Sequence, residues 1–183
     1  MIQIKNAAEL QKMRKACAIS AAALKAGGEA IEPGITTAEI DKIIYDFIVR
    51  HGARPNFLHL YGFPATACIS VNDTVIHGIP NKQQQIRPGD IVSIDTGCKI
   101  DGFNGDNACT YACGKIDLEA QRLLDVTKEG LHRGIEMARG GNRVGDIGHA
   151  VQSYVEENGF SVVRSFVGHG VGKELHEDPE VPN

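Results

Sequence analysis

Two segments near the N-terminus have the hydrophobic spacing of amphipathic helices. The first begins at Asn6, which forms a capping-box pattern with Glu9. Its apolar stripe is expected at Leu10, Met13, Cys17 and Leu24. The second begins with the same kind of signal at Thr36 and Glu39 and is expected to end at Gly52. Its apolar positions follow the i, i+3, i+4, i+7, i+8 pattern and are Ile40, Ile43, Ile44, Phe47 and Ile48.

The same pattern recurs 107 residues further along the chain. Three glycines and several core-facing positions coincide at this offset: Gly27 with Gly134, Gly34 with Gly141, Gly52 with Gly159, Ile40 with Ile147 and Leu24 with Leu131. Two amphipathic helices can align by chance, but agreement at the punctuating glycines favours an internal duplication. The sequence therefore predicts a single domain over 1–183, with a first half of about 1–112 and a second of about 113–183. Because only residues 160–183 follow the second pair, the second half is expected to be truncated.

Between and after the helical pairs the pattern is typical of strands. Runs rich in β-branched residues cover 66–71, 74–77 and 160–167, and a turn is expected at Asn72-Asp73. Segments 91–95 and 104–111 are expected to be the arms of a hairpin that turns at Asp101-Gly102. Helical pairs separated from antiparallel strands predict an α+β fold, here with internal pseudo-symmetry.

The predicted hairpin places two carboxylates on one face of the sheet. With a two-residue turn at Asp101-Gly102, position 95 faces position 108, so Asp106 is a diagonal neighbour of Asp95. Two ionised carboxylates in a partly buried site repel, which favours a protonated acid or a bound divalent cation. Two alternatives stay open: one aspartate faces solvent, or a bulge at Gly105 turns the two side chains to opposite faces.

Composition narrows the range of functions. The chain has 19 Lys and Arg against 23 Asp and Glu, a net charge of −4, so charge gives no reason to expect nucleic acid or an anionic membrane as partner. No apolar run approaches the ~20 residues that a membrane helix needs. The five cysteines are odd in number and form no Cys-x-x-Cys pair, which favours a reducing cytoplasm over a disulfide framework or a thiolate zinc site.

Histidines in glycine- and proline-rich turns are the remaining chemical signal. His169 lies in the glycine-rich run 167–172, His176 in 175–179 and His77 in 76–80. Imidazole is the commonest metal ligand in proteins, and loops carry function more often than regular elements do. Taken singly, however, each of these histidines is more often a surface residue than a catalytic one.

Four motifs taken together are similar to the type I methionine aminopeptidases, in the bacterial short form. These are Val75-Ile-His-Gly-Ile-Pro80, Ile94-Asp-Thr-Gly97 with Asp101-Gly-Phe-Asn-Gly-Asp106, Val167-Gly-His-Gly-Val-Gly172 and Leu175-His-Glu-Asp-Pro179. The resemblance covers the whole chain and implies the pseudo-two-fold "pita-bread" fold, an antiparallel sheet flanked by two helix pairs. It also implies removal of the N-terminal methionine from nascent proteins by metal-dependent hydrolysis of the first peptide bond.

The resemblance further implies roles for particular residues. Asp95, Asp106 and His169 correspond to three of five ligands of two divalent metal ions, which could be Mn, Fe, Co or Zn. The other two ligands are glutamates in segments beyond residue 183, so the 183 residues alone are expected to be inactive. His77 corresponds to a residue that contacts the scissile amide, and His176 to one that stabilises the oxyanion. Cys68, Phe63 and Leu175 correspond to the methionine pocket, with Phe63 where the family usually has Tyr and Leu175 where it often has Phe.

The expected partners are polypeptide N-termini in which Met is followed by a small residue. A monomer in the cytoplasm is expected, with no nucleic acid as substrate and no membrane, and contact with the ribosome is left open. Two other readings of the same motifs remain. One is a non-catalytic pita-bread protein that uses the cleft for binding, and the other is an aminopeptidase or dipeptidase of the same fold that acts next to proline.

Overall fold

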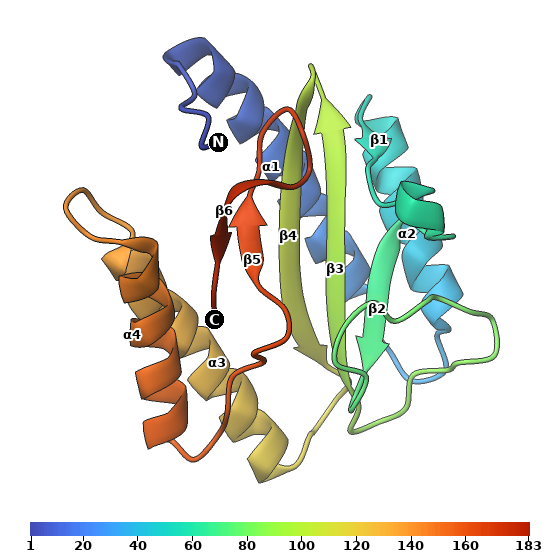
Figure 1. Ribbon diagram of the computed structural model, residues 1–183. Coiled ribbons are helices and arrows are strands. Elements are labelled where there is room, and N and C mark those ends of the chain that lie inside the picture. The colour runs from blue at the N-terminus through green and yellow to red at the C-terminus, as the bar shows by residue number, and fades with distance from the viewer. The chain divides into compact units, whose positions relative to one another are not determined.

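The computed structural model describes residues 1–183, which form two compact units. The larger unit consists of 4–116 and 171–175, and the smaller of 1–3, 117–170 and 176–183. The larger unit holds α1 (Ala7–Glu29), α2 (Thr37–Arg50), β1 (Arg54–Pro55), the 3-10 turn η1 (Leu60–Gly62), β2 (Ala67–Val71), β3 (Ile91–Ile100) and β4 (Phe103–Ala112) (Figure 1). The smaller unit holds α3 (Leu118–Met137), α4 (Val144–Glu157), β5 (Gly168–Gly170) and β6 (Glu177–Val181). The predicted α+β class is confirmed, while the division of one domain into halves near residue 112 stays a prediction.

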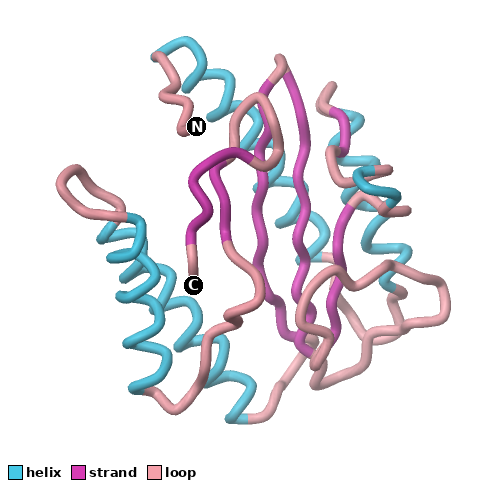
Figure 2. Tube along the Cα trace, viewed as in Figure 1, coloured by secondary structure: helices cyan, strands magenta, loops and turns pink.

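In the larger unit, β3 is the central strand of an antiparallel sheet. It pairs with β4 along its whole length on one side and with β2 and β1 on the other. Helices α1 and α2 both cover the same face of this sheet (Figures 1 and 2). The core between them contains the fully buried Ile40, Ile44 and Ile48 of α2 together with Val92 and Ile94 of β3. The opposite face of the sheet carries the polar side chains described below.

Both predicted helix starts are confirmed by complete capping boxes, Asn6 with Glu9 and Thr36 with Glu39. The predicted stripe of α1 was wrong in part, because Leu10 is 42% exposed. The buried positions of α1 are mostly small instead: Ala16, Ser20, Ala23, Leu24 and Gly27. Small residues are needed here because α1 packs almost backbone to backbone on β4, and a Cβ on Gly105 would lie 2.5 Å from the carbonyl carbon of Ala16.

The smaller unit repeats the local packing of the first helix pair. A Cβ on Gly27 of α1 would lie 2.7 Å from Ile44 of α2, and a Cβ on Gly134 of α3 would lie 2.8 Å from Val151 of α4. Each of these contacts is the other shifted by 107 residues. Gly34 and Gly141 also share a left-handed backbone, with φ of 98° and 97°. The two helix pairs are therefore built on the same plan, as the offset predicts.

Two predicted strands are absent. Residues 74–77 form no ladder, because Asn72 and His77 adopt left-handed backbones, with φ of 54° and 57°, that interrupt an extended run. Residues 160–167 pair with no neighbouring strand, and the side-chain amide of Asn183 donates to the carbonyls of Val163 and Phe166 instead. In both segments the β-branched residues favour an extended backbone, but no neighbouring strand is there to form hydrogen bonds with it.

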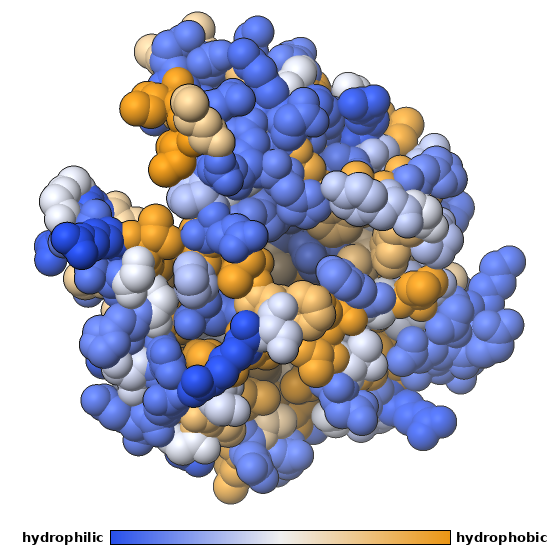
Figure 3. All heavy atoms as spheres, in the orientation of Figure 1, coloured by the Kyte–Doolittle hydropathy of each residue, from blue (hydrophilic) through white to orange (hydrophobic).

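Hydrophilic side chains predominate on the face drawn in Figure 3, with apolar side chains gathered in patches between them. None of the helices combines the length and the hydropathy that a membrane-spanning segment requires.

Candidate active site

The β3–β4 hairpin brings Asp95 and Asp106 to one face of the larger unit's sheet. Asp95 pairs with Ala108 and Gly97 pairs with Asp106, in a register without interruption. The turn is the predicted one, since Asp101 and Gly102 both have positive φ, 52° and 84°, as a two-residue type I′ turn requires. Gly105 therefore makes no bulge, and the alternative that separated the two carboxylates is excluded.

The two carboxylates strongly affect one another. Burial, followed by the negative charge of Asp106 and a hydrogen bond with it, raises the pKa of Asp95 to about 7. A carboxylate pair of this kind is relieved by a shared proton or by a hard cation. Carboxylate oxygens are ligands that divalent metals accept readily, so Asp95 and Asp106 fit the metal site that the sequence predicts.

Cys68 of β2 lies directly opposite Asp95 in the ladder. Burial and then the charges of Asp95 and Asp106 raise the pKa of the Cys68 thiol to about 12. Because a metal ligand would have to be the thiolate, this cysteine is suited to an apolar wall and not to metal binding.

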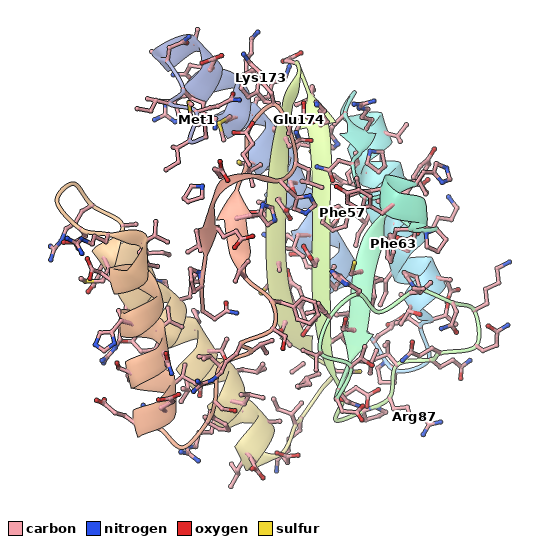
Figure 4. The ribbon with its side chains drawn as sticks, viewed as in Figure 1. Met1, Phe57, Phe63, Arg87, Lys173 and Glu174 are labelled. Carbon is pink, nitrogen blue, oxygen red and sulfur yellow. The ribbon has the colours of Figure 1, made fainter.

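Beside the carboxylates lies an apolar cluster formed by Phe57, Leu60, Phe63, Cys68 and Leu175. Phe57 and Phe63 both come from the connection between β1 and β2 (Figure 4). The structure thus gathers the three residues predicted for the methionine pocket, Phe63, Cys68 and Leu175, into one cluster. Phe57 and Leu60 were missed by the sequence reasoning, although the apolar residues that recur over 57–63, in a segment with no regular pattern, were a signal that could have identified them.

His77 is exposed and lies in the loop that returns along β2. The neighbouring Gly78 packs against that strand: its carbonyl accepts from the Ile69 N–H at 2.8 Å, and a Cβ on Gly78 would lie 2.2 Å from the Ile69 carbonyl oxygen. The φ of 57° at His77 is costly for a residue with a side chain, and such strain is found disproportionately at functional sites. The structure does not test the predicted role of His77.

In the smaller unit, the β5–β6 hairpin and the residues beside it bring His169 and His176 together. Their ring centroids are 4.4 Å apart and the rings are inclined at 61°. The Nδ1 of His169 lies 2.9 Å from the carbonyl oxygen of Gly170. Because a carbonyl only accepts, Nδ1 carries the proton, so in a neutral ring Nε2 is the nitrogen that presents a lone pair, as in many metal-binding histidines.

The aspartates belong to the larger unit and the two histidines to the smaller one. No group of three or more His, Cys, Asp or Glu side chains is placed so as to hold a metal ion. The joining of His169 to Asp95 and Asp106 therefore stays a prediction, as do the individual roles of His77 and His176.

Comparison with known proteins gives a consistent assignment. Residues 11–183 match the model of metallopeptidase family M24. The chain belongs to metallopeptidase family M24. It is 52% identical over its whole length to a methionine aminopeptidase of Clostridium perfringens and 46% identical to methionine aminopeptidase 1 of Bacillus subtilis, and in each case it spans 73% of the relative's length.

Solved structures agree with the fold. The chain superimposes on the methionine aminopeptidase of Thermotoga maritima with a TM-score of 0.98 at 42% identity, covering 100% of this chain and 74% of that one. The prolidase of Pyrococcus furiosus matches with a TM-score of 0.85 at 24% identity over 98% of this chain and 52% of that one, which shows a shared fold only. The predicted pita-bread fold, the likeness to methionine aminopeptidases and the metallopeptidase class are thereby confirmed. Membership of the M24 metallopeptidases also implies divalent metal ions as cofactors.

Proposed function

We propose that this M24 protein removes the N-terminal methionine from polypeptides by metal-dependent hydrolysis of the first peptide bond. The observation that carries the proposal is the placement of Asp95 and Asp106 on one sheet face, with the apolar cluster around Cys68 next to them. A cation-holding acidic pair beside a pocket for an uncharged side chain is the arrangement that an aminopeptidase selective for methionine needs.

In this proposal, Asp95, Asp106 and His169 hold two divalent ions together with two glutamates from segments outside residues 1–183. When bound, the ions supply Lewis acidity and a hydroxide-like nucleophile near neutral pH. Carboxylate and imidazole ligands are compatible with Mn, Fe, Co or Zn, and availability selects among them.

The other side chains bind and orient the substrate. His77 contacts the scissile amide, and His176 donates a hydrogen bond to the carbonyl oxygen as negative charge develops on it. Phe63, Cys68 and Leu175 form the pocket for the first side chain, and a flexible thioether suits such an adaptable apolar surface. Preferred substrates are nascent chains in which a small residue follows Met. A cytoplasmic monomer is the setting that we infer.

Two other functions are less well supported. The prolidase of Pyrococcus furiosus, the X-Pro aminopeptidase of Thermotoga maritima and the Xaa-Pro dipeptidase of Bacillus anthracis are 24%, 21% and 22% identical to this chain, against 52% for the methionine aminopeptidase of Clostridium perfringens. A non-catalytic binding protein is not favoured, because the half-buried Asp95–Asp106 pair costs stability through desolvation and mutual repulsion unless a cation offsets it, and the relatives named above are methionine aminopeptidases.

The test measures release of Met from a Met-Ala-Ser peptide in the presence of Mn²⁺ or Co²⁺. Two ligands are assigned to segments outside these residues, so the assay compares two proteins. One is residues 1–183 alone. The other, called the joined protein, is residues 1–183 fused to the part of the Clostridium perfringens relative that lies outside the matched region. We expect the joined protein to release Met and residues 1–183 alone to release little. Asp106→Asn should lower kcat/KM of the joined protein by roughly 100-fold or more.

Asp101→Asn is the matched control. Asp101 lies in the same hairpin, is half-exposed and pairs with Lys15, and asparagine tolerates its left-handed backbone. This variant should keep full activity. Absence of Met release from a folded joined protein, or equal activities of the Asp101 and Asp106 variants, would refute the proposal.

A further inference from the structure

Two asparagines connect the segments that form the apolar cluster. Asn104 of β4 is 2% exposed and lies on the same sheet face as Asp106, two residues along the strand. Its backbone N–H donates to the carbonyl of Gly172 at 2.8 Å, and its side-chain amide donates to the carbonyls of Gly172 and Lys173, each at 3.0 Å. These three bonds fix segment 171–175, whose last residue, Leu175, packs in the cluster.

The second asparagine, Asn56, lies in the connection between β1 and β2 and contacts Asn104 from there. The side-chain amide of Asn56 donates to Oδ1 of Asn104 at 3.2 Å, and the backbone N–H of Asn56 donates to the carbonyl of Gly97 at 3.3 Å. The next residue, Phe57, is a buried member of the cluster. Asn104 therefore bonds both loops at once, accepting from the one that carries Phe57 and donating to the one that carries Leu175.

The side chain of Asn56 can lie against Asn104 only because residue 97 is glycine. A Cβ on Gly97 would lie 2.5 Å from Oδ1 and 2.9 Å from Nδ2 of Asn56, so any side chain there would displace the amide. The Oδ1 of Asn56 is itself buried without a hydrogen-bond partner.

We propose that Asn56 and Asn104 are positioning residues that hold the two loops of the apolar cluster at a fixed separation and so set which first side chain the enzyme accepts. The inference rests on the proposed function, since it concerns the selectivity of the same pocket. Neither asparagine contacts the reacting bond. Their effect is on the distance between the wall formed by Phe57 and Phe63 and the wall formed by Leu175.

The test variant is Asn104→Asp, whose side chain keeps an oxygen to accept from Asn56 but can no longer donate to the carbonyls of Gly172 and Lys173. Asn107→Asp is the matched control, because it introduces the same charge one residue beyond Asp106 while the Nδ2 it removes is buried and makes no hydrogen bond. Both are made in the joined protein. Peptides that begin with Met or with Leu are compared.

We expect Asn104→Asp to raise KM for the Met peptide about tenfold with kcat changed less than about twofold, and to lower the preference for Met over Leu about tenfold. The control should keep the wild-type preference. A purely structural role would lower activity on both peptides equally, so an unchanged preference in Asn104→Asp would overturn the inference.

If the wild-type joined protein releases no Met, the proposed function fails and the claim about selectivity fails with it, while hydrogen exchange still decides whether the two asparagines hold the loops in place. The amides of Leu60 and Phe63 in one loop and of Gly172 in the other are hydrogen-bonded. In residues 1–183, Asn104→Asp should speed exchange in both loops at least about tenfold, while Asn107→Asp should not. Faster exchange in only one loop, or in neither, would overturn the inference.

Discussion

The close packing of α1 on β4 makes Gly105→Ala a sharp test of the fold that supports the site. A Cβ at this position would lie 2.5 Å from the carbonyl carbon and 2.6 Å from the carbonyl oxygen of Ala16, and 2.6 Å from the backbone N of Cys17. Unstrained contacts between such atoms are about 3.5 Å, so α1 has to retreat by about 1 Å. All three atoms belong to the backbone, and no change of rotamer can relieve the overlap.

Overpacking of a well-packed core costs typically 1–3 kcal/mol. We expect the upper end, about 3 kcal/mol, because the retreat of α1 would also loosen the contacts of Ala23 and Leu24, which are 0% and 6% exposed. With a urea m-value of about 2 kcal/mol/M, the unfolding midpoint should fall by about 1.5 M. Urea titration followed by far-ultraviolet circular dichroism measures this directly.

Gly140→Ala is the control, since nothing lies within 4 Å of a Cβ at that position and its φ is not left-handed. This variant should unfold at the wild-type midpoint or slightly above it. A Gly105→Ala midpoint within about 0.3 M of the wild type, with an unchanged m-value, would show that α1 is not held against β4 in the way described.

Three further predictions concern local features. Thr36→Ala removes the side-chain cap of α2 and should cost about 1 kcal/mol in thermal unfolding, and an unchanged melting temperature would contradict the capping box. Burial raises the pKa of the Asp41 carboxyl above 3.8, so the stability that Asp41 contributes at low pH is lost as the pH rises through the raised pKa. Asp41→Asn keeps the oxygen that accepts from the backbone N–H groups of Thr66 and Ala67, and it should flatten this part of the pH–stability profile. Gly134→Ala should cost less than Gly105→Ala in urea unfolding, because the Cβ would meet the movable side chain of Val151 at 2.8 Å, and an equal or larger loss would contradict this reasoning.

The predictions that succeeded rested on short-range rules. The capping residues gave the helix starts, and the Asp101-Gly102 turn gave the register that places Asp95 and Asp106 on one face. Because side chains alternate along a strand, one correctly identified turn was sufficient to place every residue of the hairpin.

The predictions that failed depended on long-range contacts. The exposure of Leu10 and the small residues of α1 follow from how closely that helix approaches β4, which its own spacing does not reveal. The irregular 74–77 segment depends on left-handed backbones at Asn72 and His77. The Asn56–Asn104 hydrogen bond joins residues 48 positions apart and leaves no local pattern in either segment.

The two-residue turn between β3 and β4 also limits how this hairpin can evolve. As long as the turn keeps two residues, inserting or deleting a single amino acid between the turn and Asp106 would shift the rest of β4 by one step and send the second acid underneath α1, where Gly105 now allows barely enough room for a hydrogen atom. Only changes by an even number preserve which way each side chain points. The stretch of β4 between the turn and Asp106 can therefore change in length only by steps of two residues if both acids are to stay on the same face.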